Sequence, residues 1–568
     1  MSALLAHMAP DIEPTCGPAQ IEIEAGSGLK IAATARLDVG GQVLSGTAAA
    51  MHILQAYRER GPDAPRHLLG EFSFAIWDNA RGIFFCARDH LGVKPFYYTA
   101  APRSFACATD QTALLALPWV QQDLNEARVA DFLHGWLERL DQTSTFYRSV
   151  ARLPPGSWLK VTADGKLLQQ RYWQLEPGEP LALPDQGAYN EALLEYFTRA
   201  VERRLANEGD TGVALSGGVD SGAIVAVARN LEHFQHTQKL HTFSGVAEDD
   251  QHCQETMRLR GVVAQGGVTP HYLAPSQAPT LNENWPLQRK TCEPFDAHMN
   301  FYALCCQAAA GANVSIMLDG VDDVIMDNVD SYPAYLIRSG RWLCAWHEIS
   351  ARSVLTGGAQ TKSYLLKRHL REQPGMRQLL AWRNQRASRA VDPVTAAVRG
   401  TLINPDLARR VDLPGRLQAL EATWPAGLSA TMAEANCADI NHPFLTVALE
   451  RYHRVASNFG IEPRHPWLDR ELVEWAIRLP WQQRNQHGWT KYLVRQAMQG
   501  KLPSESLTQV DNAHVGWAIT EARYKSMAPY LDGSLDDVAW AIDVPRLNAS
   551  NDPELRWRAL ALIQWLRQ

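Results

Sequence analysis

The residues best suited to chemistry form one short run, SGGVDS, at Ser216–Ser221. The run follows a short apolar segment typical of a strand and precedes GAIVAVARNL, which is typical of a helix. A phosphate at such a turn would meet unpaired backbone N–H groups, the positive end of the helix dipole and hydroxyl donors. Glycines let the backbone approach the anion closely. We therefore predict a phosphate site with these candidate residues: Leu215, Ser216, Gly217, Gly218, Asp220 and Ser221.

Acidic residues add a metal-binding element to this prediction. The carboxylate of Asp220 is expected to bind Mg²⁺, which neutralises a departing pyrophosphate. A second acidic loop, LDGVDD, ends at Asp322 and Asp323 and follows an apolar, strand-like segment. Such a loop at the carboxyl edge of a parallel sheet faces the ligand crevice. We expect Asp322 or Asp323 to supply the other magnesium ligand, and the pattern leaves the choice between them open.

The elements that must position these loops show in the hydrophobic pattern. From residue 188 helices and strands alternate, which favours a doubly wound parallel sheet. Residues 335–568 are mostly helical, and residues 30–100 are mainly strands around one Ala-rich helix. The segment 176–187 has three prolines and two glycines and is the expected linker. Three parts are therefore expected: residues 1–118, a bridging segment 119–187, and residues 188–568.

Composition excludes several classes of protein. The chain has 568 residues, of which 46% are hydrophobic and 20% charged, as expected for a globular protein of two or three domains. A formal net charge of −6 is not the basic footprint of a nucleic-acid-binding protein. No apolar run approaches the roughly 20 residues that span a bilayer, and no secretory signal is recognisable. The nine cysteines form no CxxC pair. We expect reduced, buried thiols in a cytoplasmic protein with no nucleic-acid or membrane partner.

SGGxDS is the pyrophosphate loop of the ATP-pyrophosphatase superfamily, and later segments resemble the synthetase domain of asparagine synthetases. HTFSGVAED resembles the strand and turn that hold adenine, with Ser244 near the base. LDGVDD occupies the place of the second Gly/acid loop, so Gly320 joins the nucleotide-binding residues. Two more segments fit the family in the expected order, GIEPRHPWLDRELVEWAIRLP (460–480) and GWTKYLVRQAMQGKLP (488–503). The resemblance implies ATP and Mg²⁺ as ligands and an acyl-adenylate as intermediate.

The segment GEFSFAIWDNARGIFFCARDHLGVKPFYY (70–98) strongly resembles a class II glutamine amidotransferase domain. In working glutaminases a Cys follows the initiator Met and its α-amine acts as base for its own thiol. Ser2 stands at that position here, and the nearest cysteine is Cys16. The glutamine-binding Asn-Gly-Glu segment is replaced by Gly40–Leu44, which reads GGQVL. A terminal Ser can act as a nucleophile of this fold, but a packing scaffold is the simpler interpretation.

The resemblance therefore implies an α/β protein: an N-terminal Ntn-type glutaminase-like α+β domain, then a doubly wound parallel-sheet ATP-pyrophosphatase synthetase domain with a helical C-terminal part. Without glutamine hydrolysis, the amine must come from the substrate. This fits lasso-peptide cyclases, which join a peptide's N-terminal amine to an Asp or Glu side chain. Their partners would be a precursor peptide and a leader peptidase. The alternatives are a β-lactam-synthetase-like or other small-molecule amide ligase, a glutamine-dependent asparagine synthetase, and a catalytically silent peptide-binding homologue.

One departure affects catalysis directly. The family has a Lys after LPSESL that stabilises negative charge on the adenylate intermediate. Here Asp511 or Asn512 stands in that position. His514 is a candidate replacement donor, although a lone His in a polar loop is more often incidental. Lys525 is a second candidate for the missing cation.

Overall fold

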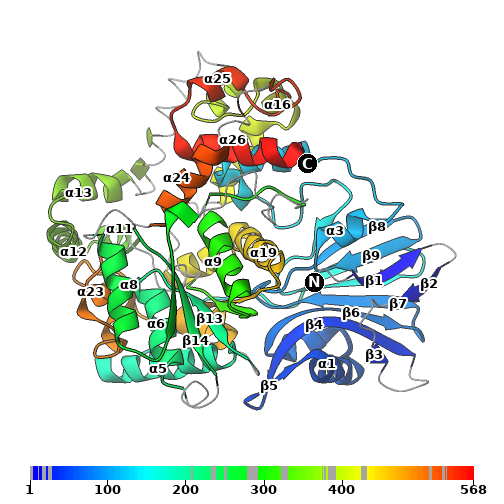
Figure 1. Cartoon of the computed structure of the whole chain (residues 1–568), viewed down its shortest axis with the longest axis horizontal. Coiled ribbons are helices and arrows are strands. Elements are labelled where there is room, and N and C mark those ends of the chain that lie inside the picture. Colours follow the sequence, from blue (N-terminus) through cyan, green and yellow to red (C-terminus); the bar gives the residue numbers. More distant parts are fainter. Residues whose placement is uncertain are drawn as a thin grey trace.

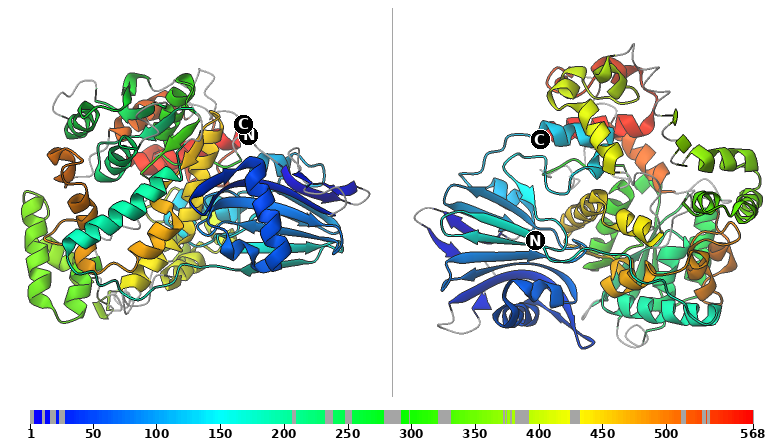
Figure 2. Two further views of the ribbon diagram at one scale, coloured as in Figure 1. Left: turned by 90° about the horizontal axis from the view of Figure 1, so that it is seen from below. Right: turned by 180° about the vertical axis from the view of Figure 1, so that it is seen from behind.

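The computed structural model has two parts that lie side by side, an N-terminal part of antiparallel sheets and a larger part around a parallel sheet (Figures 1 and 2). It describes residues 4–9, 12–15, 21–22, 28–205, 209–231, 238–247, 253–277, 292–297, 299–320, 331–371, 373, 375–376, 379–380, 392–423, 432–510, 515–527, 531 and 534–567. The expected sites Ser2, Asp322, Asp323 and His514 lie outside these residues, as do Cys16, Asp511 and Asn512.

Two antiparallel sheets form the N-terminal part. The first has the order β10-β8-β9-β1-β2, with β1 Leu4–Ala9, β2 Ile12–Thr15, β8 Tyr97–Ala101, β9 Ser104–Ala108 and β10 Ala151–Arg152. The second has the order β12-β11-β7-β6-β4-β3, and β5 pairs with β4. Its strands are β3 Ile21–Glu22, β4 Leu29–Val39, β5 Gln42–Ser45, β6 Gly70–Asp78, β7 Ile83–Arg88, β11 Ser157–Thr162 and β12 Leu167–Arg171.

Alternation along the strands gives the second sheet two apolar faces. On β6, Ala75 and Trp77 face the first sheet, where they join Phe84 and Phe105 in one core. The intervening side chains, such as Ile76, join a separate core under α1 (Gly46–Arg60). The period of two along a strand produces this division. The predicted α+β character of the N-terminal part is therefore confirmed, and α1 is found to cover the second sheet (Figure 1).

The bridging segment contributes to both parts. Its strands β10, β11 and β12 complete the two antiparallel sheets. The sequence NEARVADFLHGWLERL predicts one helix, but the chain turns at Gly135, whose φ is +77°. Two shorter elements result, α4 (Glu126–His134) and the 3-10 helix η2 (Trp136–Arg139). Side chains of α4 pack with those of the C-terminal helix α26 (Pro553–Leu566) in a shared core.

A five-stranded parallel sheet with the order β15-β14-β13-β16-β17 centres the larger part. Its strands are β13 Thr211–Ala214, β14 Leu240–Gly245, β15 Thr269–Leu273, β16 Ile316–Leu318 and β17 Glu462–Arg464. The chain proceeds from β13 to β14 and β15 on one side, and then crosses to β16 and β17 on the other. Strand order thus reverses between β13 and β16, and ligands of open α/β sheets bind beyond the carboxyl ends of strands at such a point.

Helices cover both faces of this sheet, so the doubly wound prediction is confirmed. One face packs against α5 (Gln186–Glu202), α6 (Val219–Ala228) and α8 (Gln254–Ala264) through Val213, Leu215 and Leu318. The opposite face packs against α9 (Met299–Gly311) and α19 (Pro443–Ser457) through Phe243 and Met317.

The rest of the described chain is mainly helical, as predicted. Its helices are α11 Ser331–Arg338, α12 Trp342–Leu355, α13 Lys362–Arg371, α15 Pro393–Ala397, α16 Pro405–Arg410, α17 Leu413–Thr423, α18 Met432–Ile440, α20 Arg470–Ala476, α21 Trp481–Arg484, α22 Tyr492–Ala497, α23 Ser504–Leu507, α24 Gly516–Met527 and α25 Val544–Ala549. Short elements elsewhere are η1 Gly61–Asp63, α2 Ala64–His67, α3 Gln111–Leu115, η3 Pro275–Gln277 and η5 Pro466–Leu468. Among the described residues, none of these helices has the length and apolar content needed to cross a bilayer.

The cysteines follow the expectation except for the half-buried Cys253 and the exposed Cys344. All eight described cysteines are free thiols, and six of them are buried. Cys344 is exposed because it lies on α12, at the edge of the molecule farthest from the N-terminal sheets (Figure 1).

A buried ion cluster joins the two parts. Glu450 on α19 accepts hydrogen bonds from Arg88 on β7 at 3.0 Å, Arg152 on β10 at 2.6 Å and Tyr97 on β8 at 2.8 Å. The side chains of Glu450, Arg88 and Arg152 are 0% exposed. Burial opposes ionisation of Glu450, but the charges of Arg152 and Arg88 outweigh it and lower the pKa of its carboxyl. Glu293 extends the cluster through its own contact with Arg152 at 2.9 Å.

Replacing Glu450 with Gln tests this junction, because the change keeps the shape of the side chain and removes its charge. We expect the free energy of unfolding to fall by about 3–5 kcal/mol, since two buried guanidinium groups lose their shared carboxylate. Chemical denaturation followed by tryptophan fluorescence measures the change. The control is Asp406→Asn, which removes an exposed ion pair with Arg409 and is expected to cost less than about 1 kcal/mol. Equal, small effects would contradict a stabilising role for the cluster.

Candidate active site

The predicted phosphate loop lies at the point where strand order reverses. β13 ends at Ala214, and α6 begins at Val219. Gly217 has φ +75°, and a Cβ there would lie 2.7 Å from the backbone N of Leu259 at the adjacent helix α8. Only glycine combines this conformation with so close an approach. The loop is therefore held tightly against α8.

Hydroxyl and amide groups gather inside the loop. The backbone N–H of Ser216 donates to Oγ of Ser221 at 3.2 Å, and the two serine Oγ atoms are 3.1 Å apart. Gly218 is the N-cap of α6 and has no side chain with which to cap the first-turn N–H groups. These groups and the helix dipole form a cradle that fits an anion such as the phosphates of ATP.

Asp220 faces a lysine that the sequence did not identify. Nζ of Lys491 lies 2.5 Å from Oδ2 of Asp220, and the two side chains are 10% and 18% exposed. Lys491 is the N-cap of α22 and has a left-handed backbone conformation, with φ +55°. The carboxylate of Asp220 in the loop thus fits Mg²⁺. The ammonium group of Lys491, which comes from another segment, fits a phosphate oxygen. Tertiary structure brings together residues that are 271 positions apart.

The start of the second acidic loop packs directly against the phosphate loop. A Cβ added at Gly320 would lie 3.1 Å from the backbone N of Ser221, so a larger residue here would crowd the phosphate loop. The preceding Asp319 is buried and lies 2.7 Å from Nδ1 of His465, which is also buried. Nε1 of Trp467 donates to the carbonyl of Asp220 at 3.4 Å. Asp319 and the segment 465–467 therefore fix the position of the crevice wall, and the magnesium role of Asp322 or Asp323 stays a prediction.

Two other candidates have contrasting positions. Ser244 is 1% exposed near the carboxyl end of β14, and the neighbouring Phe243 accepts a backbone hydrogen bond from Leu215 at 2.9 Å. That contact places the end of β14 beside the phosphate loop, while the adenine role of Ser244 stays a prediction. Lys525 lies on α24 with its side chain 73% exposed, and it pairs with Glu521 at 3.0 Å. The cation that the structure brings to Asp220 is Lys491 and not Lys525.

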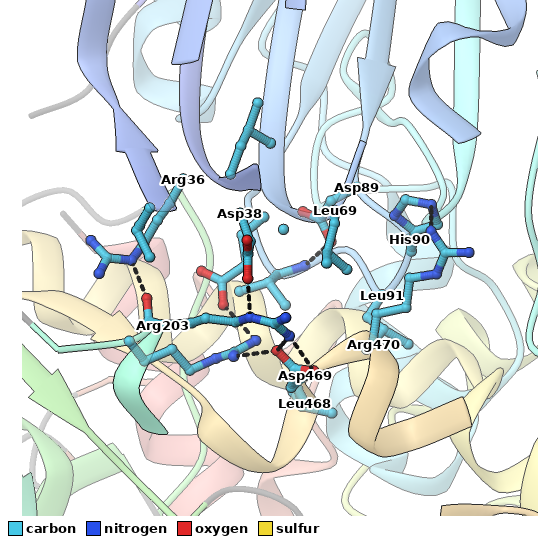
Figure 3. A pocket seen from close by; sticks show the side chains of 16 residues that line it. Arg36, Asp38, Leu69, Asp89, His90, Leu91, Arg203, Leu468, Asp469 and Arg470 are labelled. Atoms are coloured by element: carbon cyan, nitrogen blue, oxygen red, sulfur yellow. Dashed lines mark hydrogen bonds and ion pairs between the residues drawn. The ribbon is translucent and has the colours of Figure 1, made fainter. Parts of the chain in front are cut away.

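A cavity lies between the N-terminal sheets and the larger part (Figure 3). Gly40 and Gly41 form the tight turn between β4 and β5. Both have positive φ, which explains why glycines stand at these two positions. The labelled lining residues are Arg36, Asp38, Leu69, Asp89, His90, Leu91, Arg203, Leu468, Asp469 and Arg470.

Charged side chains cross this cavity and hold the two parts together. Arg36 donates to the backbone carbonyls of Arg203 at 2.5 Å and Leu205 at 2.6 Å. Arg203 in turn pairs with Asp38 and lies 3.2 Å from Asp469. Burial lowers the pKa of Arg36 to about 10. For Asp469, burial favours the neutral acid, but the charges of Arg204 and Arg203 outweigh it and lower the pKa.

Buried titratable groups line the far side of the same cavity. Burial lowers the pKa of His90 to about 3, and the nearby charge of Arg470 acts in the same direction. Burial raises the pKa of Asp89 to about 6, although this carboxyl accepts hydrogen bonds from the amides of Val93 and Lys94 at 2.9 Å. His90 is therefore neutral at pH 7. Its environment suits packing better than proton transfer at that pH.

The fold and the loop define a class: a glutaminase-like domain followed by an asparagine-synthetase-like amide ligase domain. A family model described as "Asparagine synthase" matches residues 192–537, and one described as "Glutamine amidotransferase domain" matches residues 33–173. The first match covers more than half of the chain, and the chain belongs to the asparagine synthase family.

Individual relatives are distant. The chain is 26% identical over 472 residues to "Asparagine synthetase [glutamine-hydrolyzing] 3" of Bacillus subtilis, covering 80% of this chain and 68% of that protein. It is 31% identical over 193 residues to "Putative asparagine synthetase [glutamine-hydrolyzing] 2" of Methanocaldococcus jannaschii, covering 34% of this chain and 36% of that one. It is 30% identical over 185 residues to "Amidase chry2" of Gibberella zeae, covering 32% and 26%. For the last two, the match spans only about a third of the relative or less.

A solved structure of a glutamine phosphoribosylpyrophosphate amidotransferase from B. subtilis is 11% identical with a TM-score of 0.20, covering 58% of this chain and 62% of that one. A score this low carries no argument about the fold.

Nucleotide binding tests the assignments of Asp220 and Lys491. We expect Lys491→Met to weaken the binding of Mg²⁺ and ATP together by about tenfold or more, because an ammonium group near the phosphates is lost. Asp220→Asn is expected to remove the gain in affinity that Mg²⁺ provides. Isothermal titration calorimetry with and without Mg²⁺ measures both effects. The matched control is Lys525→Met, which removes an exposed lysine and is expected to leave the affinity unchanged. An effect of Lys525→Met as large as that of Lys491→Met would mean that Lys491 has been misassigned.

Proposed function

We propose that the protein activates a carboxylate with ATP and joins it to an amine of the same substrate, closing a macrolactam in a peptide as lasso-peptide cyclases do. One observation carries the proposal. The chain combines a phosphate loop, with Lys491 beside Asp220, and a cavity between the glutaminase-like and synthetase domains that is crossed by the protein's own ion pairs. The first feature supports adenylation, and the second supports an amine that comes from the substrate.

In the first step, an oxygen of the substrate's Asp or Glu carboxylate attacks the α-phosphorus of ATP. The bond from this phosphorus to the bridging oxygen of the β-phosphate breaks, and pyrophosphate leaves. The first-turn N–H groups of α6, the hydroxyls of Ser216 and Ser221 and the ammonium group of Lys491 are placed to bind the negative charge. Mg²⁺ on Asp220 would neutralise further charge on the leaving group.

In the second step, the substrate's N-terminal amine attacks the acyl carbon of the adenylate. The bond from this carbon to the phosphate oxygen breaks, AMP leaves, and the amine proton passes to a base or to solvent. The chain's contribution is to hold the two ends of one substrate within reach of each other. A precursor peptide is the proposed substrate, and a leader peptidase that removes its first segment is the proposed partner.

Contacts in the cavity between the two parts support an amine that comes from the substrate itself. Arg36 reaches across to the carbonyls of Arg203 and Leu205, and Arg203 pairs with Asp38 and Asp469. A glutamine bound among these groups would have to displace several paired charges, and breaking buried ion pairs is costly. We therefore propose that the N-terminal domain is a scaffold that does not release ammonia.

A second candidate is a small-molecule amide ligase of the β-lactam-synthetase kind. The observation that supports it is that the three relatives described above are named asparagine synthetases and an amidase. The same nucleotide chemistry serves both candidates, so they differ only in the substrate that turns over.

Product analysis tests the adenylation step. With the precursor peptide present, we expect ATP to be converted to AMP and pyrophosphate, because the loop lacks the Lys that a Walker loop uses for cleavage of the β–γ bond. Chromatography of the nucleotides measures this. Asp220→Ala is expected to abolish turnover because the magnesium ligand is lost. The circular dichroism spectrum should stay unchanged, since the Asp220 side chain is not part of the hydrophobic core. ADP and phosphate as main products would exclude the proposed adenylation. If no substrate led to ATP consumption, the protein would be the catalytically silent peptide-binding homologue.

Isotope labelling tests the source of the amine. With glutamine carrying ¹⁵N in its side-chain amide, we expect an unlabelled product that has lost the mass of one water, as lactam closure requires. Mass spectrometry separates this from an amide made with ammonia, which would carry the label. Ser2→Ala is expected to leave the product unchanged. Labelled nitrogen in the product would contradict the internal amine and indicate an asparagine-synthetase-like function.

A further inference from the structure

Three potential metal ligands meet at a site outside the nucleotide crevice. His347 and Glu348 are neighbours on α12, and His487 lies in the turn before α22. One ligand atom from each of the three residues can be chosen so that all lie within 4.8 Å of one another. α12 and α13 lie at the edge of the molecule away from the N-terminal sheets (Figures 1 and 2).

The turn that carries His487 is rigidly defined. Gln486 and Trp489 exchange backbone hydrogen bonds of 3.1 and 2.9 Å around His487 and Gly488. Both central residues have positive φ, +55° for His487 and +75° for Gly488, as in a type I′ turn. A Cβ on Gly488 would lie 2.4 Å from the backbone N of Arg352 on α12, so the turn is packed directly against that helix.

Glu348 fixes the turn and keeps capacity for a metal. Its carboxylate accepts hydrogen bonds from the backbone N–H groups of His487 at 3.1 Å and Gly488 at 2.7 Å. The Glu348 side chain is 12% exposed, so the surrounding atoms restrict its movement. Each carboxylate oxygen has a second lone pair after accepting one N–H. Glu348 can therefore bind a cation without releasing the turn.

The two imidazoles complete the donor set. The His347 side chain is 64% exposed, and its Nδ1 lies 4.0 Å from Oε1 of Glu348. The rings of His347 and His487 meet edge to face with centroids 5.8 Å apart. Nε2 of His487 lies 3.3 Å from the side-chain amide of Gln486, a long and exposed contact that a metal ion would readily replace.

We propose that His347, Glu348 and His487 form a binding site for a divalent transition metal ion of the zinc class. Two imidazole nitrogens and one carboxylate oxygen suit Zn²⁺, whereas Mg²⁺ prefers oxygen ligands alone. Bonds of about 2.0–2.2 Å require the ligand atoms to approach to about 3.3 Å of one another. Rotation of the exposed His347 ring supplies this movement, and water fills the remaining positions.

Bound metal would connect α12 to the nucleotide crevice. The turn at His487 and Gly488 leads, through Trp489 and Thr490, to Lys491, whose ammonium group meets Asp220. A metal ion that ties the turn to α12 therefore restrains the segment from which Lys491 reaches the phosphate loop. The site is separate from the predicted magnesium ligands and does not depend on the proposed function.

The test uses Zn²⁺ alone as the probe, with the full-length chain in buffer containing excess Mg²⁺. We compare the wild type with the double variant His347→Asn/His487→Asn and with the control His67→Asn, which changes an exposed histidine of α2. Asn at position 487 keeps the fold, because Asn-Gly is a preferred pair for a type I′ turn.

We expect the wild type and the control to bind one more Zn²⁺ per chain than the double variant by elemental analysis after dialysis. Calorimetry should show the affinity at this site falling by at least about tenfold in the single variant His347→Asn, since one of three protein ligands is lost. Zinc is also expected to raise the melting temperature of the wild type and not that of the double variant. Equal zinc content in all three proteins would overturn the proposal, as would unchanged affinity in His347→Asn.

Discussion

The arrangement of the two parts depends on the buried hydrogen bonds and ion pairs that the carboxylate of Glu450 makes. This carboxylate lies at the centre of α19, behind the parallel sheet, and receives Arg88, Tyr97 and Arg152 from three strands of the N-terminal part. Charges this deeply buried are tolerated only when they are paired and hydrogen-bonded. The strands must therefore approach α19 in one orientation, and this fixes how the glutaminase-like domain sits on the synthetase domain.

That fixed orientation gives the N-terminal domain a structural role. Its strands supply Arg88 and Arg152 to the buried cluster, and its cavity-lining residues Arg36 and Asp38 contact the loop that follows α5. Removing the domain would leave Glu450 without Arg88 and Arg152 and Arg203 without Asp38, and it would expose apolar surface. These contacts tie the N-terminal domain to the synthetase domain.

Within the synthetase domain, one chain of contacts runs from the molecular edge to the phosphate loop. Glu348 on α12 holds the turn at His487 and Gly488, and the same segment then presents Lys491 to Asp220. On the other side of the loop, Gly320 packs under Ser221 while His465 holds Asp319. The acid that is predicted to bind magnesium is thus positioned from both sides by elements distant in sequence. This organisation gives events at α12 a physical route to the nucleotide site.

The division into two structural parts and the location of the phosphate loop follow from the sequence alone. These features depend on local pattern: alternation of apolar residues in strands such as β6, and a run of glycine, serine and aspartate between a strand and a helix. The sequence also indicated that Gly40–Leu44 could not bind glutamine in the usual way, because the expected side chains are absent.

Only the tertiary structure decided which charged groups meet. The segment that contains Lys491 resembles the family, but its sequence does not show that this lysine, and not Lys525, reaches Asp220 across 271 positions; Lys525 is an exposed partner of Glu521. The ion pairs around Glu450 and Asp469, and the meeting of His347 with His487, likewise depend on how distant elements pack. Local sequence determines the conformation of a segment, whereas the partner of a side chain is set by the packing of the whole chain.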